Sequence, residues 1–323
     1  MTDHAPEPGP VMIVGGAEDK LGDRVILSRF VQLAGGEDAR IVVITTASSL
    51  GESAADVYRE IFLALGAVEV VGVRPLTRTE ANAAAVAQPL KQATGIFLSG
   101  GNQLRLSSIV AGTRLARELQ AAHLRGAAIA GTSAGASALA GHMMAFGASG
   151  ATPKHRMAHV AEGLGILNGM IVDQHFEQRT RLGRLLSVVA GSPSLLGIGL
   201  DEDTAAIVHP NDTIEVIGRG AVTIVDGSEI ATDAHESRGH RPMMVSGAIL
   251  HSVPSGYLFD LTTRRVRPHL TEAALARRRA AEERARKAVT RFRNRLAEDA
   301  GKSEPDRQRR AARDRSSDRE ASE

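Results

Sequence analysis

Short apolar runs alternate with segments of helical periodicity through the first half of the chain. The runs PVMIVGG, RIVVITTAS, VEVVGV, GIFLSGG and GAAIAG are separated by amphipathic stretches such as DRVILSRFVQLAGG and ESAADVYREIFLALGA. A strand without polar alternation is buried on both faces, and a helix between two such strands returns the chain for parallel pairing. The pattern therefore predicts an α/β fold, with a mostly parallel sheet flanked by helices.

The second half predicts further strands and the end of the folded part. GMIVDQHF and LLGIGLD continue the strand pattern, and a helix is expected from about Glu177. The runs TAAIVH, TIEVIG, AVTIVD, GAILHSV and GYLFDL predict extra antiparallel strands that complete the same domain. We expect a flexible N-terminus at residues 1–8, a single α/β domain at 9–270, and a charged tail at 271–323.

The tail accounts for the basic balance of the chain. Between Glu272 and Glu323 there are 16 Lys and Arg against 11 Asp and Glu, which leaves 23 basic and 26 acidic residues elsewhere. This segment predicts a helix that gives way to a disordered end. A non-catalytic protein that binds polyanions through the tail is one alternative. Nucleic acid is not the favoured partner, because acids are interspersed among the basic residues of the tail and Phe292 is its only aromatic residue.

Composition excludes several kinds of chemistry. The chain has no cysteine, so disulfides, thiolate nucleophiles and zinc–thiolate sites are absent. The start MTDHAPEPGP lacks the features of a signal peptide, and no apolar run is long enough to span a bilayer. IVGGAEDK lacks the spacing of a nucleotide-binding loop. We expect a cytoplasmic protein with no membrane partner, no metal and no cofactor.

A serine between glycines marks the most informative turn. Gly131-Thr-Ser133-Ala-Gly135 fits G-x-S-x-G, with a buried strand before it and a helix of small residues after it. The first amide of that helix, from Ala134, can stabilise a developing oxyanion. We interpret Ser133 as a nucleophile, and the alternative is an ordinary helix N-cap.

A nucleophilic serine requires a base and an acid that orients it. His175 follows GMIVDQ at the expected end of a strand, where parallel sheets gather functional groups. Three other histidines are expected to be solvated: His123, His142 and His155. The acid follows the strand GIGL, and spacing alone does not choose among three candidates: Asp201, Glu202 and Asp203.

The order serine, histidine, acid differs from that of the α/β-hydrolases, in which the acid precedes the histidine. That order would need a later base, and those available lie in a polar loop or on an apparent antiparallel strand: His235, His240 and His251. A lipase-like hydrolase is therefore not favoured.

Two other clusters have polar groups suited to a substrate. In FLSGGNQ, Gly101 offers a second oxyanion donor and Gln103 can reach the substrate, although Asn102 could simply cap the next helix. After His175 come three arginines, whose forked guanidinium groups suit carboxylates: Arg179, Arg181 and Arg184. A solvated ion pair with Glu177 on the expected helix is the alternative.

FLSGGNQ, GTSAGAS, GLGILNGMIVDQHFEQRTRLGRL and GIGLDEDTA together resemble the cyanophycinases, serine exopeptidases related to the aspartyl dipeptidases, over about residues 9–268. The resemblance implies a fold like that of class I glutamine amidotransferases, a homodimer, and a metal-free mechanism. It implies Ser133 as nucleophile, His175 as base and Glu202 as orienting acid. It also implies a set of substrate-binding residues: Gln103, Asp173, Gln174, Arg179, Arg181 and Arg184.

The implied substrate is cyanophycin, a polyaspartate chain with arginine joined through its α-amine to each β-carboxyl. Chain-end cleavage would release β-aspartyl-arginine. The alternative within the same superfamily is an aspartyl dipeptidase or another isopeptidase acting on small β-aspartyl peptides. The charged tail has no counterpart in the family pattern.

Overall fold

The computed structural model describes residues 7–51, 53–236 and 239–269. The expected flexible N-terminus is described only at residues 7 and 8, and the expected tail at 271–323 lies outside the described residues. All the elements named below belong to one compact unit, Met1–His269.

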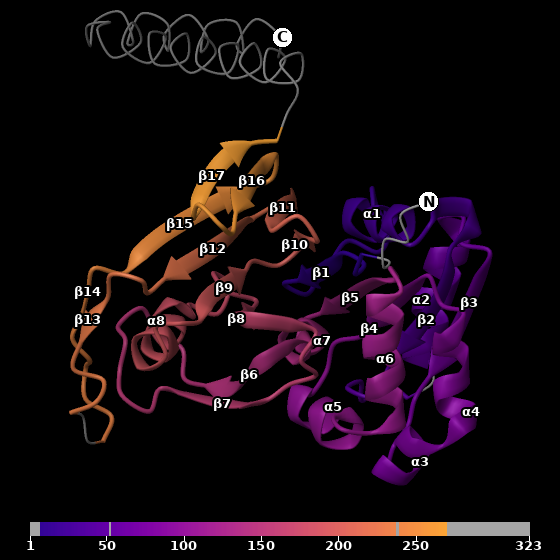
Figure 1. The fold of residues 1–323 in the computed structure, drawn as a ribbon, viewed down its shortest axis with the longest axis horizontal. Helices are drawn as coiled ribbons and strands as arrows, with labels where there is room; N and C mark the ends of the chain where they lie inside the picture. Colours follow the sequence, from indigo (N-terminus) through magenta and orange to yellow (C-terminus); the bar gives the residue numbers. More distant parts are fainter. Residues whose placement is uncertain (1–6, 52, 237–238, 270–323) are drawn as a thin grey trace, which may run out of the picture. The chain divides into compact units, whose positions relative to one another are not determined.

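The first apolar runs form the parallel part of the larger sheet. They are β1 (Val11–Val14), β2 (Arg40–Ile44), β3 (Glu69–Val73), β4 (Gly95–Leu98) and β5 (Ala128–Thr132). They lie in the order β1-β5-β4-β2-β3, and every neighbouring pair is parallel. The predicted parallel sheet, with helices packed on it, is confirmed (Figure 1).

Helices cover both faces of these strands. They are α1 (Val25–Leu33), α2 (Ser53–Ala64), α3 (Arg78–Asn82), α4 (Ala84–Ala87), α5 (Gln103–Val110), α6 (Arg114–Leu124) and α7 (Ala134–Leu139), with two 3-10 turns, η1 (Gly36–Asp38) and η2 (Gln88–Lys91). On the α1 and α2 face, Phe30, Phe62 and Phe97 form an aromatic cluster with ring centroids 5.3 to 5.5 Å apart. The opposite face packs against α5, α6 and α7 in a separate core.

Antiparallel strands extend the larger sheet from β1. They are β10 (Thr204–His209), β11 (Thr213–Gly218), β16 (Tyr257–Asp260) and β17 (Arg265–Pro268), which give nine strands in all. A two-stranded ribbon is formed by β13 (Ala231–Thr232) and β14 (Val245–Ser246). Within the described ranges, no helix is both long enough and apolar enough to cross a bilayer.

A second sheet of six strands was not anticipated. It contains β6 (Ala140–Gly147), β7 (Ala158–Glu162), β8 (Leu167–Gln174), β9 (Leu196–Leu200), β12 (Ala221–Asp226) and β15 (Ile249–Pro254). Its strands β6, β8 and β9 are parallel, and α8 (Leu182–Gly191) packs on it through Leu185 and Val189. The antiparallel runs predicted from the sequence are therefore shared between two sheets.

Two predicted helices have different bounds in the structure. The small-residue helix after Ser133 ends at Leu139, and the chain continues as strand β6 from Ala140. The helix expected from about Glu177 begins only at Leu182. Between His175 and Leu182 the chain makes tight turns, and His175 and Thr180 have positive φ angles of 47° and 49°.

Candidate active site

Ser133 lies on the sharp turn between β5 and α7. Its backbone has φ 51° and ψ −111°, and its N–H donates to the Val14 carbonyl at 2.9 Å. Small residues make this turn possible: a Cβ on Gly131 would come within 2.5 Å of the Gly135 backbone. Ser133 occupies the N-cap position, but its side chain makes no capping hydrogen bond. The hydroxyl is therefore available to another partner. The alternative interpretation, in which the Ser133 side chain caps the helix, does not agree with the structure.

That partner is His175, at the end of β8. The Ser133 Oγ lies 2.9 Å from His175 Nε2, and His175 Nδ1 lies 2.6 Å from a carboxylate oxygen of Glu202. A carboxylate can only accept, so Nδ1 carries the proton and Nε2 accepts from the serine hydroxyl. Serine, imidazole and carboxylate thus form one chain of hydrogen bonds at the carboxyl ends of β5, β8 and β9.

The three neighbouring acids have separate partners. Asp201 is buried and accepts from the Glu177 and Ala221 amides at 3.1 and 3.0 Å. Asp203 accepts from the Asp19 amide at 2.8 Å and pairs with an arginine on the surface, Arg219. Only Glu202 of the three lies against His175, and its side chain is 37% exposed.

The pKa of His175 is lowered from the ordinary value of 6.5. Burial is the largest cause, because it penalises the charged imidazolium, and the nearby positive charges of Arg179 and Arg181 act in the same direction. The hydrogen bond to Glu202 and the charge of Glu202 oppose this shift. The imidazole therefore remains neutral at neutral pH and able to accept a proton.

The IVGGAEDK segment, which the sequence reasoning set aside, forms one wall of the site. The Gly15 carbonyl accepts from the His175 amide at 2.9 Å, and the Gly16 carbonyl accepts from the Asp203 amide at 2.9 Å. A Cβ on Gly16 would lie 2.4 Å from His175 Cε1 and 2.7 Å from Nε2. Gly16 also has a φ of +97°. The paired glycines thus make room for the imidazole, a signal visible in the sequence but not specific enough to interpret.

The same segment places a buried carboxylate next to the turn at Ser133. Glu18 accepts from the Thr132 hydroxyl and the Tyr58 hydroxyl, each at 2.6 Å, and pairs with Lys20 at 2.6 Å. Burial raises the pKa of Glu18, but the Lys20 charge and the hydrogen bonds outweigh it and leave the pKa below its usual value. Glu18 therefore ties the end of β5 to β1 and α2 as an ionised group.

Glycines of FLSGGNQ lie beside Ser133. A Cβ on Gly100 would be 3.3 Å from Ser133 Cβ and 3.8 Å from its Oγ. Gly101 has a φ of +141°, and a Cβ there would collide with the Ala47 carbonyl at 2.1 Å. The Ala134 amide, the first of α7, has no acceptor within its own helix. The loop at Gly100 and the first turn of α7 thus flank the serine.

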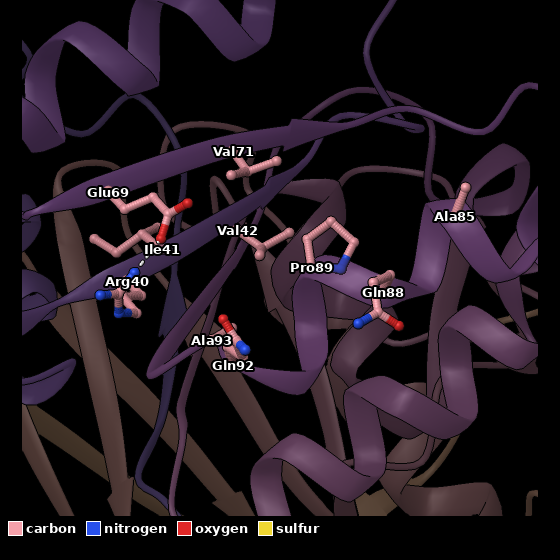
Figure 2. A pocket seen from close by; sticks show the side chains of 10 residues that line it. All are labelled: Arg40, Ile41, Val42, Glu69, Val71, Ala85, Gln88, Pro89, Gln92 and Ala93. Atoms are coloured by element: carbon pink, nitrogen blue, oxygen red, sulfur yellow. Dashed lines mark hydrogen bonds and ion pairs between the residues drawn. The ribbon is translucent and has the colours of Figure 1, made fainter.

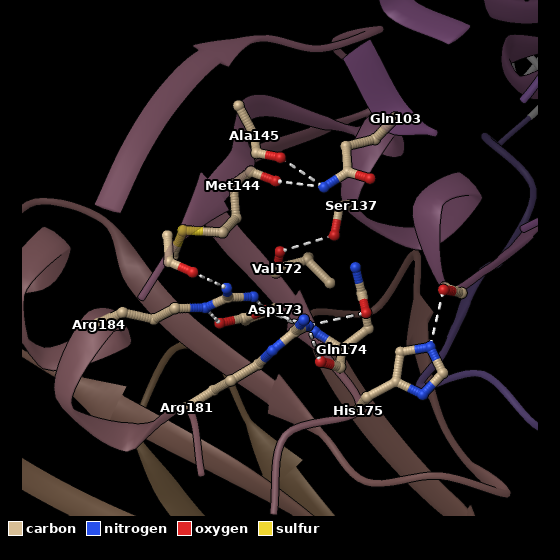
Figure 3. A network of polar contacts seen from close by, with 12 residues as sticks. Gln103, Ser137, Met144, Ala145, Val172, Asp173, Gln174, His175, Arg181 and Arg184 are labelled. Carbon is tan, nitrogen blue, oxygen red and sulfur yellow. Dashed lines mark hydrogen bonds and ion pairs between the residues drawn. The ribbon is translucent and has the colours of Figure 1, made fainter. Parts of the chain in front are cut away.

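The polar residues after these glycines have defined contacts. Asn102 caps α5 by accepting from the Arg105 amide at 3.0 Å, which is the alternative that the sequence left open. Gln103 donates to the Ala145 carbonyl at 2.6 Å and to the Met144 carbonyl at 3.3 Å (Figure 3). Gln103 is half-buried, and it joins the start of α5 to the end of β6.

The expected substrate-binding arginines divide into two kinds. Arg181 and Arg184 are buried, at 8% and 4% exposure, and their guanidinium groups converge on the fully buried Asp173 (Figure 3). Arg184 Nε donates to Asp173 at 2.5 Å, and Arg181 donates to the Gln174 side-chain oxygen at 2.9 Å. Arg179, in contrast, is exposed.

This arrangement corrects two expectations. Glu177 is not on a helix with Arg181, so the solvated ion pair between them is absent, and Asp173 is the carboxylate that Arg181 meets. Arg184 and Asp173 are both buried, and their charged groups form an ion pair with each other instead of facing a ligand. His155, expected to be solvated, is also buried.

One pocket of the surface lies away from these groups. A pocket of about 420 Å³ lies beside Arg40 and Glu69, the first residues of β2 and β3, and is lined by Pro89 and Gln92 from the opposite side (Figure 2). The pocket therefore lies near the amino ends of β2 and β3, whereas Ser133 lies at the carboxyl edge of the same sheet. Among the described residues, no three His, Asp or Glu side chains gather as metal ligands do.

Strands from both sheets bring a serine, a histidine and a carboxylate together at their carboxyl ends, and this arrangement places the chain among the hydrolytic enzymes. Comparison with known sequences narrows the class. The chain belongs to peptidase family S51, whose sequence profile matches residues 11–217. It is thus a peptidase.

Proteins named cyanophycinase are similar to this chain over most of their length. The chain is 40% identical to a cyanophycinase of Synechococcus elongatus over 265 residues, 81% of this chain and 82% of that one. It is 40% identical to the cyanophycinase of Trichormus variabilis over 263 residues, 80% and 87% of the two chains. Among solved structures, a peptidase from an acI-B1 actinobacterium has a TM-score of 0.57 at 22% identity, covering 76% of this chain and 98% of that one, which supports the shared fold.

Proposed function

We propose that this peptidase is a serine exopeptidase that hydrolyses cyanophycin to β-aspartyl-arginine. The observation that carries the chemistry is the chain of hydrogen bonds from Ser133 through His175 to Glu202. The choice of substrate rests on the relatives that are 40% identical to this chain and are named cyanophycinase. An aspartyl dipeptidase is not favoured, because these relatives match about four-fifths of the chain.

In this proposal Ser133 Oγ attacks the scissile carbonyl while His175 Nε2 takes the hydroxyl proton. Glu202 holds the Nδ1 proton and stabilises the imidazolium that forms. The amides of Ala134 and Gly101 bind the oxyanion of the tetrahedral intermediate. The imidazolium then protonates the leaving amine, and a water molecule, deprotonated by His175, hydrolyses the acyl-enzyme.

The substrate-binding roles follow the exposure of the side chains. Arg179, exposed and near His175, binds a substrate carboxylate, and Gln103 contacts the substrate beside the oxyanion amides. The buried group formed by Asp173, Arg181 and Arg184 has a positioning role, because its hydrogen bonds to Gln174 fix the end of β8. Gln174 and the imidazole of His175 are thereby held in position for the reaction.

The proposal also includes the fold type and the homodimer that the family resemblance implies. The elbow at the end of β5 supports a fold of the class I glutamine amidotransferase type. A homodimer is part of the proposal, and sedimentation equilibrium of the full chain tests it: a single species of one chain's mass would contradict it.

Incubation of the purified chain with cyanophycin tests the proposed function. We expect β-aspartyl-arginine from the first time points, without intermediate oligomers, because an exopeptidase releases units from an end. Hydrolysis of small β-aspartyl peptides with the polymer left intact would indicate an aspartyl dipeptidase instead. Binding of the polymer without any hydrolysis would indicate a binding protein.

The lowered pKa of His175 predicts the acid side of the pH profile. His175 must be neutral to accept the serine proton, so kcat/KM falls as pH drops through its pKa in the free enzyme. Because that pKa is lowered, the midpoint should lie below pH 6.5. Replacing Arg179 with alanine removes a positive charge and should move the midpoint to higher pH. A midpoint above 6.5 in the unchanged enzyme would contradict this assignment.

Gly16 provides a test of the imidazole position. In Gly16→Ala the new methyl group would overlap the His175 ring, 2.4 Å from Cε1, and the ring must move away from Ser133. A displacement of about 1 Å costs on the order of 10²-fold in rate, so kcat should fall by about that factor. Hydrolysis of cyanophycin at saturating substrate measures it.

Gly66→Ala is the matched control. Gly66 has a φ of +100°, close to the +97° of Gly16, but a Cβ there would meet no atom within 4 Å. Both substitutions therefore carry the same backbone strain, about 1 to 2 kcal/mol, and only one strikes the imidazole. Equal kcat in the two variants, at similar melting temperatures, would show that Gly16 does not position His175.

A further inference from the structure

A pocket of about 460 Å³ lies just beyond the end of β6 and has no role in the chemistry described above. Its polar lining is basic: Lys154, Arg156, His159 and His240. Phe146 forms an aromatic wall, 53% exposed, with its ring stacked on His159 at 4.2 Å between centroids. None of the residues that line the pocket is acidic. We refer to it as the Lys154 pocket.

The positive charges of the Lys154 pocket are not neutralised by neighbouring acids. Lys154 and Arg156 are exposed, and neither forms an ion pair within the described part of the chain. The nearby carboxylate of Asp233 is already engaged, 3.5 Å from the buried His155 and 2.8 Å from the Met244 amide that donates to it. The two cations therefore face solvent with free donors.

The loop that presents these cations is fixed by backbone hydrogen bonds. The His155 amide donates to the Arg241 carbonyl at 3.0 Å, and the Met243 amide donates to the Pro153 carbonyl at 3.0 Å. Arg156 has a φ of 53°, a conformation that a non-glycine residue keeps only when its surroundings impose it. A basic pocket built on a fixed loop loses little conformational entropy when it binds an anion.

Three contacts connect the Lys154 pocket to the catalytic edge. The Gly150 amide donates to the Thr180 carbonyl at 2.7 Å, in the turns that follow His175. Arg184 donates to the Gly147 carbonyl at 3.1 Å, and Gln103 donates to the Ala145 carbonyl next to Phe146. These contacts place the pocket beside the proposed site on the β6 side.

We propose that the Lys154 pocket is a second subsite that binds a carboxylate of the polymer, at least one repeat away from the bond that is cut. This inference rests on the proposed function. Each repeat of cyanophycin displays a free arginine carboxylate, which a lysine and an arginine bind by charge-assisted hydrogen bonds. The exposed face of Phe146 suits the guanidinium of the same repeat. The subsite would favour long chains over short ones.

The double variant Lys154→Gln with Arg156→Gln tests the subsite. Two exposed charged contacts together are worth about a three- to tenfold change in binding. We expect KM for long soluble chains to rise by that factor with kcat unchanged, and KM for a two-repeat fragment to stay the same. The matched control is Lys91→Gln with Arg265→Gln, which removes two exposed charges from η2 and β17.

Binding measured in a Ser133→Ala background separates this inference from the proposed function. Cyanophycin chains labelled with a fluorophore should bind three- to tenfold more weakly after the pocket substitutions, but not after the control substitutions. If the wild-type chain releases no dipeptide while this difference in binding persists, the proposed function fails and the subsite stands. Equal behaviour of the pocket and control variants, in KM and in binding, would overturn the subsite.

Discussion

Replacing Ser133 with alanine is expected to lower kcat on cyanophycin by about 10⁴-fold or more, with the fold unchanged. In the proposed mechanism the Oγ of Ser133 attacks the substrate carbonyl, and no other hydroxyl is hydrogen-bonded to His175 among the described residues. Alanine differs from serine by that oxygen alone. The residues that follow, Ala134 and Gly135, are also small, so the turn accommodates alanine at position 133. Dipeptide release at saturating polymer measures the loss, and the melting temperature measures the fold.

Ser137→Ala is the control for this experiment. Ser137 is a buried serine on the same short helix, and its Oγ donates to the Val172 carbonyl at 3.1 Å (Figure 3). Its loss should cost about 1 kcal/mol of stability and leave kcat near the wild-type value. If Ser133→Ala retained turnover within tenfold of wild type, Ser133 would not be the nucleophile. A serine-directed phosphonate should also label the wild-type protein and the Ser137 variant, but not the Ser133 variant.

The parallel half of the fold could be predicted because four of its five strands, β1, β2, β4 and β5, are almost entirely buried. A wholly apolar run such as IVVI or GIFL has one stable environment, the centre of a covered sheet, and the helices between the runs require parallel pairing. The second sheet was not predicted because small residues carry little periodic signal. The helix that starts at Ala134 ends at Leu139, and the chain continues into β6 through Ala140, a small residue like those of the helix itself.

The turns after His175 could not be predicted from the sequence for a different reason. His175 and Thr180 adopt positive φ angles, which sequence normally signals with glycine or asparagine. Here tertiary contacts impose them, including the bond from the His175 amide to the Gly15 carbonyl. The sequence therefore gave no sign that the helix starts at Leu182 or that Arg181 faces a buried carboxylate. Ser133 could be found from its pattern, because its strained turn needs glycines that are visible in the sequence.

The choice among the three acids could not be made from spacing, because it depends on residues far away in the chain. Asp201 is held by the Ala221 amide of β12, and Asp203 by the Asp19 amide. The side-chain oxygen of Gln178 accepts from the Glu202 amide at 3.0 Å and fixes the backbone there. These contacts turn Glu202 toward His175 and the two aspartates away from it.

Glu202→Gln is therefore expected to lower kcat by about 10³-fold or more, whereas Asp201→Asn and Asp203→Asn should leave kcat within a few-fold of wild type. Glutamine preserves the size of the side chain but can present its NH₂ to Nδ1, which favours the tautomer with the proton on Nε2. In that tautomer the imidazole cannot accept the Ser133 proton, and no carboxylate stabilises the imidazolium.

The aspartate variants should instead report on stability. Asp201 accepts two backbone amides in a buried position, so the asparagine variant should lose about 1 to 3 kcal/mol of unfolding free energy while the remaining folded protein keeps its kcat. Asp203 pairs with the largely exposed Arg219, and its change should be milder. The three kcat values, measured with cyanophycin at a temperature where all variants are folded, separate the two kinds of role. A damaging Asp201→Asn beside a nearly silent Glu202→Gln would mean that the 2.6 Å contact between Glu202 and His175 does not orient the base.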